Sequence, residues 1–139
     1  MRSVLAGLIL ASLLSGAAQA CSCGPSPTAA AIRQSAGAVF TGIALSSRRA
    51  APGEAITTFK VTESFKGPAA GAMVRVRHPD GSSASCGIRF TTGQSHTLAA
   101  AATPQRPLSA NLCSVWMFLP HVGLSEKLIG ELRVLRGQP

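Results

Sequence analysis

The four cysteines of this chain are the residues with the clearest capacity for chemistry: Cys21, Cys23, Cys86 and Cys113. The first two are separated by one residue and directly follow Ala18-Gln19-Ala20, the small-residue pattern at which signal peptidase cuts. Cleavage there would make Cys21 the first residue of the mature chain. The chain would then begin with a cysteine that carries a free α-amine.

The first 20 residues, Met1 to Ala20, are predicted to be a secretory signal peptide, with Arg2 as the positive start and Val4 to Leu14 as the apolar stretch. That stretch is too short to span a bilayer, and no other segment reaches the roughly 20 apolar residues required. We therefore expect a soluble monomer in the periplasm or outside the cell. A lipoprotein peptidase also cuts before cysteine, but it prefers Leu three residues upstream, where this chain has Ala18. Simple cleavage is favoured over lipidation of Cys21.

Removal of these 20 residues from the 139 of the chain leaves 119, the size of one domain, over residues 21–139. All four cysteines lie in this part, and an even number in an exported chain favours two disulfides. Of the three possible pairings, the one that joins Cys21 to Cys23 would close a strained small ring. Two pairings remain open, and each joins both N-terminal cysteines to distant parts of the chain. The mature N-terminus should therefore be held rigidly.

The mature chain is strongly basic. Loss of Arg2 leaves 12 Lys and Arg against 5 Asp and Glu, a formal charge of +7. This charge is typical of a solvated basic surface. The alternative is a surface that binds an anionic envelope component, such as an anionic polysaccharide or lipopolysaccharide, or an acidic protein face. Nucleic acid is not expected, because the chain is exported, has no Tyr and interleaves no aromatic residues with basic ones. The basic residues are spread along the sequence. Pairs of them occur in an expected loop (Arg48 and Arg49), along an expected strand (Arg75 and Arg77) and at an expected helix end (Arg133 and Arg136).

The elements that must position the cysteines are short. A helix is expected over Thr28 to Gln34, capped by Ser26, and another from a Ser125 cap to about Leu135. Ser46 to Ala55 contains Pro52-Gly53 and is predicted to be a loop. The late helix carries an apolar stripe expected to pack in the core, formed by Leu124, Leu128, Leu132 and Leu135. The strand candidates, from β-branched and alternating residues, are Ala38–Leu45, Ile56–Phe65, Met73–His78, Ser95–Ala101 and Leu108–Val115.

This order of elements predicts a mainly β fold, a small closed barrel with an early and a late helix packed on it. Catalysis is not expected, because Asp80 is the only Asp, no Ser/His/Asp motif is present, and Ser83 and Ser85 have no evident base. No cofactor is expected either. His78, His96 and His121 match no standard metal-site spacing with the Cys-x-Cys pair, and oxidised cysteines cannot ligate as thiolates.

Several features in one order resemble a known family. A mature Cys-x-Cys start and an early helix are followed by Phe65-Lys66-Gly67, by Ser83-Ala84-Ser85-Cys86-Gly87, and by Cys113-Ser114 before an aromatic and a helix. This set is similar to the N-terminal domain of the tissue inhibitors of metalloproteinases (TIMP), within the netrin-like module. The resemblance covers essentially the whole mature chain. It implies a five-stranded barrel of the oligonucleotide/oligosaccharide-binding (OB) type, with Greek-key topology, and disulfides joining Cys21 to Cys86 and Cys23 to Cys113.

The resemblance also implies a function as a metalloprotease inhibitor. The amine and carbonyl of Cys21 would chelate the catalytic zinc of a partner protease, and Ser22 would enter the specificity pocket beside it. Cys23-Gly24-Pro25 would follow the cleft, with Ser83, Ala84, Ser85 and Cys86 packed alongside. The chain departs from the animal inhibitors in lacking a further disulfide within this domain and a second domain. Two alternatives therefore remain: Cys21 and Cys23 as structural cross-links only, and a non-inhibitory envelope-binding or adhesion module.

Overall fold

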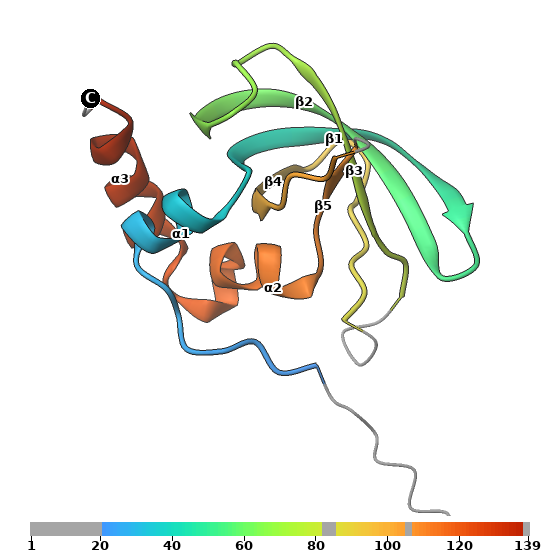
Figure 1. Ribbon diagram of the computed structural model, residues 1–139, viewed down its shortest axis with the longest axis horizontal. Coiled ribbons are helices and arrows are strands. Elements are labelled where there is room, and N and C mark those ends of the chain that lie inside the picture. The colour runs from blue at the N-terminus through green and yellow to red at the C-terminus, as the bar shows by residue number, and fades with distance from the viewer. Residues whose placement is uncertain (1–20, 82–85, 105–106, 138–139) are drawn as a thin grey trace, which may run out of the picture.

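The fold is known here from a computed structural model, which describes residues 21–81, 86–104 and 107–137. The predicted signal peptide lies outside these residues. The described part of the chain forms a curled five-stranded sheet with helices on one side and below it (Figure 1). In chain order the elements are α1 (Ala29–Ser35), β1 (Ala38–Ala51), β2 (Glu54–Lys66), β3 (Met73–Pro79), β4 (Ser95–Ala100), β5 (Leu108–Ser109), α2 (Leu112–Val115), η2 (Trp116–Phe118), η3 (Pro120–Val122) and α3 (Ser125–Arg136).

The strands lie side by side in the order β4-β1-β2-β3-β5. All neighbouring strands are antiparallel except β3 and β5, which are parallel. Ala101, just after β4, forms an antiparallel bridge with Ser109 of β5 through N–H···O=C bonds of 2.8 and 2.9 Å. The two outer strands of the sheet are therefore linked at this point, and the mainly β prediction with five strands is confirmed.

The prediction of a loop over Ser46 to Ala55 is wrong. β1 continues to Ala51, and β2 begins at Glu54, so that only Pro52 and Gly53 form the turn between them. The β1 residues from Leu45 to Ala50 are all exposed, because this end of the hairpin extends away from the core. A strand exposed on both faces carries no alternation of polar and apolar residues, which removes the signal by which a strand is predicted.

The strand predicted over Leu108 to Val115 is also corrected. β5 has only two residues, and the chain turns into α2 at Leu112. Asn111 starts this helix: its backbone N–H donates to Ser114 Oγ at 3.1 Å, and Ser114 Oγ donates to Asn111 Oδ1 at 3.5 Å. A side chain that caps a helix offers the backbone an alternative to strand pairing. Ser114, part of the Cys113-Ser114 motif, therefore helps to place Cys113 on a helix.

Two apolar cores lie on opposite sides of the sheet. Within its curve, Phe40, Phe59 and Val76 form one core with residues of β4 and the 86–90 segment. Between the sheet and the helices, Val39 and Phe65 form a second core with α1, η2 and α3. β1 contributes to both, because successive side chains of a strand point to opposite faces. The leucine stripe of α3 packs in the second core as predicted, with Leu128 and Leu132 buried and Leu124 and Leu135 partly buried.

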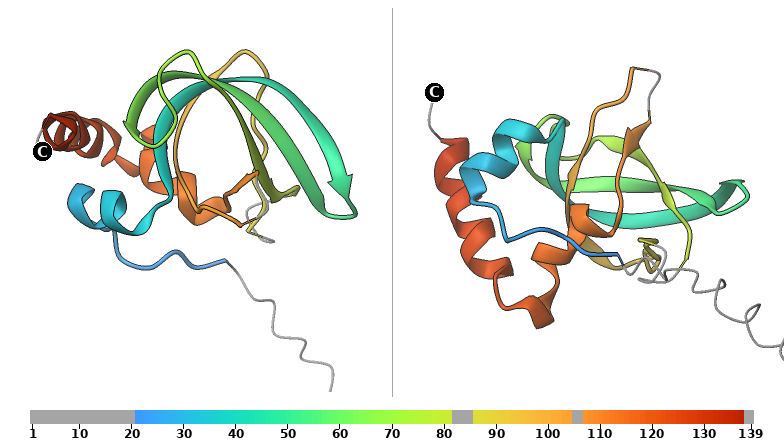
Figure 2. Two further views of the ribbon diagram at one scale, coloured as in Figure 1. Left: turned by 45° about the horizontal axis from the view of Figure 1, so that its top comes forward. Right: turned by 60° about the horizontal axis from the view of Figure 1, so that its bottom comes forward.

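The helices α1 and α3 pack together beside one end of the sheet (Figure 2). Arg33 of α1 donates to the Leu135 carbonyl at 2.5 Å, and Arg133 of α3 forms two hydrogen bonds of 2.9 and 2.8 Å with the Glu63 carboxylate of β2. Both predicted caps are corrected by one to two residues. Thr28 Oγ1, not Ser26, accepts from Ala31 N–H at 3.2 Å, and Ser125 is the first residue within α3.

The Phe65-Lys66-Gly67 motif joins β2 to α1. Phe65 is buried in the core beneath the helices. Lys66 Nζ donates to the carbonyls of Arg33 at 2.7 Å and Ala36 at 2.5 Å, so that the ammonium group satisfies the C-terminal end of α1. Gly67 has a φ of +92°, which glycine adopts without strain. The motif thus fixes the helix that directly follows the N-terminal cysteines.

Candidate functional site

Two disulfides hold the N-terminal segment to the body of the protein. Cys21 is bonded to Cys86, and Cys23 is bonded to Cys113 of α2, with Cα–Cα distances of 5.1 and 5.3 Å. This is the pairing that the family resemblance implies, and it is confirmed. No free cysteine remains. Because the two bonds reach 65 and 90 residues along the chain, the Cys21–Cys23 segment is attached at two separate points of the fold.

The two attachment points are themselves connected. The Leu112 N–H, next to Cys113, donates to the Cys86 carbonyl at 3.1 Å. Cys86 has a φ of +57°, a left-handed conformation that is uncommon for a residue with a side chain. The following Gly87 lies so close to Gly81 that a Cβ at position 87 would be 2.7 Å from the Gly81 nitrogen. Backbone contacts on both sides therefore hold Cys86, and through it Cys21, in place.

The cross-linked segment presents an exposed edge. Ser22, Gly24 and Pro25 are exposed, whereas Cys21 and Cys23 are half-buried. Among the hydrogen bonds of the described residues, none involves residues 21–27. A Cβ added to Gly24 would meet nothing within 4 Å. The two disulfides limit the freedom of this exposed edge.

Three residues of the loop before Cys86 were predicted to pack beside this edge. These residues, Ser83, Ala84 and Ser85, lie outside the described part of the chain. The loop is attached on either side at positions that are described. Gly81 packs against Gly87, and Ile88 N–H donates to the Pro79 carbonyl at 2.9 Å. Cys86 is the one residue of this predicted group whose place is described, directly across the disulfide from Cys21.

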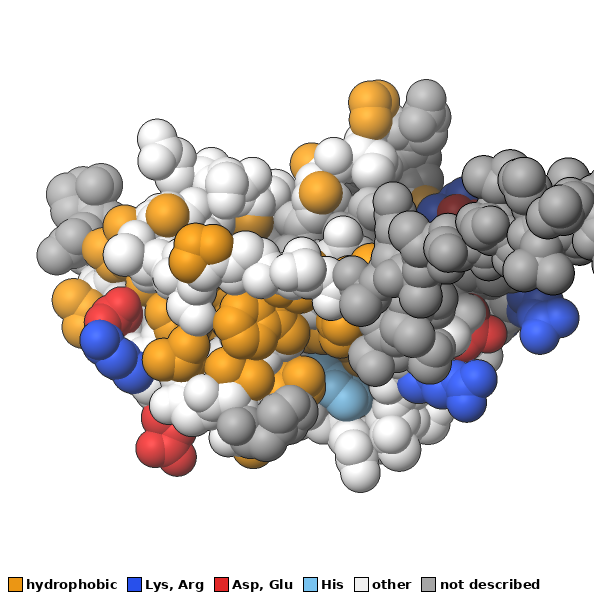
Figure 3. All heavy atoms as spheres, turned by 90° about the horizontal axis from the view of Figure 1, so that it is seen from below, with side chains coloured by type: hydrophobic (Ala, Val, Ile, Leu, Met, Phe, Trp, Pro, Cys, Tyr) orange, Lys and Arg blue, Asp and Glu red, His pale blue; other side chains and the backbone are white. Residues whose placement is uncertain are grey.

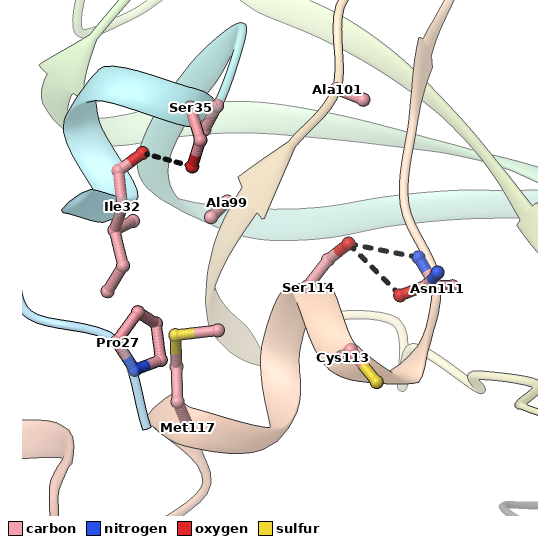
Figure 4. A pocket seen from close by; sticks show the side chains of 10 residues that line it. Pro27, Ile32, Ser35, Ala99, Ala101, Asn111, Cys113, Ser114 and Met117 are labelled. Atoms are coloured by element: carbon pink, nitrogen blue, oxygen red, sulfur yellow. Dashed lines mark hydrogen bonds between the residues drawn. The ribbon is translucent and has the colours of Figure 1, made fainter. Parts of the chain in front are cut away.

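A shallow pocket of about 270 Å³ lies behind the edge, between α1 and α2 (Figure 4). Pro27, Ile32 and Met117 form an apolar wall, and the Asn111–Ser114 pair forms the polar side. Cys113 also lines it, and its sulfur points away from the Asn111–Ser114 pair (Figure 4). Sequence reasoning missed this pocket, because Leu108 to Val115 was predicted as a strand. The paired Asn and Ser three positions apart, a helix-start signal, could have revealed it.

The face of the molecule below the sheet carries a broad group of hydrophobic side chains, with a histidine beside them (Figure 3). The chain between residue 21 and α1 runs along this lower side, below α2, in Figure 1. Trp116, Met117 and Phe118, which follow the Cys113 helix, belong to the core between the sheet and the helices. They support the site by packing, and Met117 also forms part of the pocket wall.

No metal-binding histidine joins the cysteines in the described part of the chain. There, the single group of three candidate ligands is Cys21, Cys23 and Cys113, whose sulfur atoms lie within 4.8 Å of one another. All three sulfurs are in disulfides and cannot act as thiolate ligands. His78 and His96 instead flank Phe90, with ring centroids 5.0 and 5.1 Å from it.

His78 is a hydrogen-bonded core residue. It is 2% exposed, and its Nε2 lies 2.8 Å from Thr57 Oγ1. Its Nδ1 lies 3.2 Å from the Pro79 carbonyl, which can only accept, so Nδ1 donates this bond. His78 is therefore engaged within the fold and is not available to a ligand.

Comparison of the chain with known protein-family models finds no match, and no curated protein matches its sequence. Among the helices of the described residues, none is long and apolar enough to cross a membrane.

Proposed function

We propose that the mature protein is an inhibitor of a zinc metalloprotease, and that it acts through the α-amine and backbone carbonyl of Cys21. One observation carries the proposal. The Cys21–Cys23 segment is cross-linked at two points, yet its backbone forms no hydrogen bond within the described residues. An exposed segment that is already held rigidly can enter a protease cleft at a small entropic cost.

The chemistry follows from the charge state of the new N-terminus. A catalytic zinc site keeps one position for water, which a nitrogen and an oxygen from one residue can replace. An α-amine titrates near pH 7.7 to 8.0, so a neutral, ligating fraction is present near neutrality, and metal binding displaces the remaining protons. Signal cleavage before Cys21 is a condition of this proposal, because an amide nitrogen in an uncut chain is a poor ligand.

The topology supports the finer part of the fold proposal, an OB-type Greek-key barrel. The order β4-β1-β2-β3-β5, the parallel β3–β5 pair and the Ala101–Ser109 bridge are the features expected of such a closed sheet. In this arrangement the disulfides attach the N-terminal edge at the lower end of the barrel. Neither Cys86 nor Cys113 lies in a sheet strand, so the edge can be held without breaking the strand ladder.

The experiment that tests the proposal adds one Ala before Cys21 of the mature protein. This converts the amine of Cys21 to an amide and displaces the new amine by about one residue length, while both disulfides can still form. We expect binding to a sensitive zinc protease to weaken by about 3 kcal/mol or more, which is about 100-fold. Inhibition would be measured against a panel of zinc proteases, with the melting temperature as the control for folding.

Two outcomes would contradict the proposal. One is equal inhibition by the native and the Ala-extended protein. The other is a lipid on Cys21 in the intact mass of the native protein, because acylation blocks the same amine. A protein with one Ala added at its C-terminus serves as the matched control, since it changes the mass equally and leaves the amine unaltered.

A further inference from the structure

The outer face of the sheet gathers cationic side chains from three neighbouring strands. Ile56 of β2 pairs with Arg48 of β1 on one side and with Arg77 of β3 on the other. Two residues along β2, Thr58 pairs with Ser46 and with Arg75 in the same way. Directly paired residues point to the same side of a sheet. The alternate residues Thr57, Phe59 and Val76 are buried, so these rows face outward.

A third row extends this surface along the strands, with Lys60 of β2 paired to Met73 of β3. We call the four exposed cations the cationic face: Arg48, Lys60, Arg75 and Arg77. Neighbouring strands lie about 4.8 Å apart, so the α-carbons of Arg48 and Arg77 are about 10 Å apart across β2. From the Ile56 row to the Lys60 row the distance along β2 is about 13 Å, at about 3.3 Å per residue.

Three of the five acidic residues pair with cations outside this face. The chain has five of them, and the one on this face is Glu54, which pairs with Arg77 at 3.3 Å. Glu63 pairs with Arg133 and Arg136, Glu131 with Lys127, and Asp80 with Arg89. Within the described residues, neither Arg48 nor Arg75 nor Lys60 forms an ion pair. The cationic face therefore carries an excess of three positive charges that the fold does not neutralise.

The side chains at the centre of the face are shorter than the cations around them. Ile56 is only 6% exposed and belongs to neither apolar core, as expected where long side chains on both neighbouring strands lean over it. The next row carries the hydroxyl groups of Thr58 and Ser46. The outward positions of β2 thus form a band about 13 Å long with cations on both sides and hydroxyl groups in the middle.

We propose that this cationic face binds a linear anionic polysaccharide that lies along β2. Charge complementarity and the shape of the band both favour such a ligand, because its acidic groups can meet arginines on either side while its hydroxyl groups meet Thr58 and Ser46. No aromatic residue stands in the three rows, so neutral sugars and unpaired bases would lack a stacking surface. The sheet is curved outward here (Figure 2), and a flat bilayer would touch only part of it.

The test compares heparin binding by two double variants of the oxidised protein. Arg48→Gln with Arg75→Gln removes two unpaired cations of the face. Lys127→Gln with Arg136→Gln removes the same charge from α3, on another side of the molecule. At about 0.15 M salt we expect the first pair to weaken heparin binding by about tenfold or more and to flatten its salt dependence, and the second pair to weaken it by less than about twofold.

Equal loss in the two double variants would overturn the proposal, because binding would then follow net charge alone. Tighter binding to phosphatidylglycerol vesicles or to single-stranded DNA than to heparin would also overturn it. Matching melting temperatures would show that both variants are folded. The inference is independent of protease inhibition: the Ala-extended protein should bind heparin as the native protein does, and the Arg48/Arg75 variant should inhibit as the native protein does.

Discussion

At the scale of one residue, the surroundings of His96 change the pKa of its imidazole. Its ring lies on β4, with centroids 5.1 Å from Phe90 and 6.4 Å from Phe59. Its Nε2 is buried and has no hydrogen-bond partner among the described residues. Burial lowers the pKa of His96, and a hydrogen bond with the Thr91 backbone opposes this in part. The fold therefore favours the neutral imidazole.

This predicts a loss of stability in acid. The folded pKa of His96 lies below its unfolded value of about 6.5, so the unfolded chain takes up the proton first as the pH falls. The free energy of unfolding is therefore not reduced by His96 above about pH 6.5, and it decreases as the pH falls from there toward the folded pKa. The melting temperature of the native protein should fall from pH 7 to pH 5 more steeply than that of His96→Phe. Parallel curves for the two proteins would rule the prediction out.

Lys66 acts at the scale of elements, because it connects the end of β2 to the end of α1. A helix end leaves carbonyl groups without partners, and the Lys66 ammonium reaches those of Arg33 and Ala36. The chain then returns to the sheet at Ala38 with Gly37 N–H donating to the Ala100 carbonyl at 2.9 Å. One side chain thus fixes where the helix that follows the N-terminal cysteines meets the sheet.

Replacement of Lys66 by Met should destabilise the protein by about 1–2 kcal/mol, because charge-assisted hydrogen bonds to the helix end are lost while the aliphatic stem is largely kept. Urea unfolding would measure the change. Lys60→Met is the matched control, since Lys60 lies on the exposed face and forms no hydrogen bond or ion pair within the described residues. Equal stability of the two variants would show that the contacts of Lys66 with α1 contribute nothing.

The whole molecule is small, and long-range cross-links replace part of what a larger core would supply. The Cys23–Cys113 bond spans 90 residues and joins the N-terminal edge to α2. Its removal enlarges the conformational freedom of the unfolded chain and releases the edge in the folded one. The same bond should therefore support both stability and the proposed inhibition.

Replacing Cys23 and Cys113 together with Ala should lower the free energy of unfolding by about 2–5 kcal/mol. Thermal unfolding under oxidising conditions would measure this, with non-reducing peptide mapping to verify that Cys21 stays bonded to Cys86. The native protein with reductant present is the comparison in which both bonds are lost, and it should be less stable still. An unchanged melting temperature in the double variant would contradict the prediction.

Features that depend on local pattern or composition could be predicted from the sequence. The leucine stripe placed α3 within a residue or two, strict alternation placed β3, and the four cysteines indicated two disulfides. The predictions of α3 and β3 succeed because the period of the apolar residues indicates which face of a helix or strand is buried. The disulfide pairing could not be predicted in this way. The number and spacing of the cysteines left two pairings open, and only the family resemblance distinguished them.

Three further features could not be predicted from any local pattern. The β1–β2 hairpin extends through Ser46 to Ala51 because each strand supplies hydrogen bonds to the other, although the exposed residues carry no apolar period. α2 replaces a predicted strand because the carbonyl of Cys86 accepts from its first N–H, and because Cys113 within it is bonded to Cys23 at the other end of the chain. The cationic face exists because register brings Arg48 and Arg77 to either side of Ile56. Such features are set by contacts between distant segments, and no single segment encodes which partner it will meet.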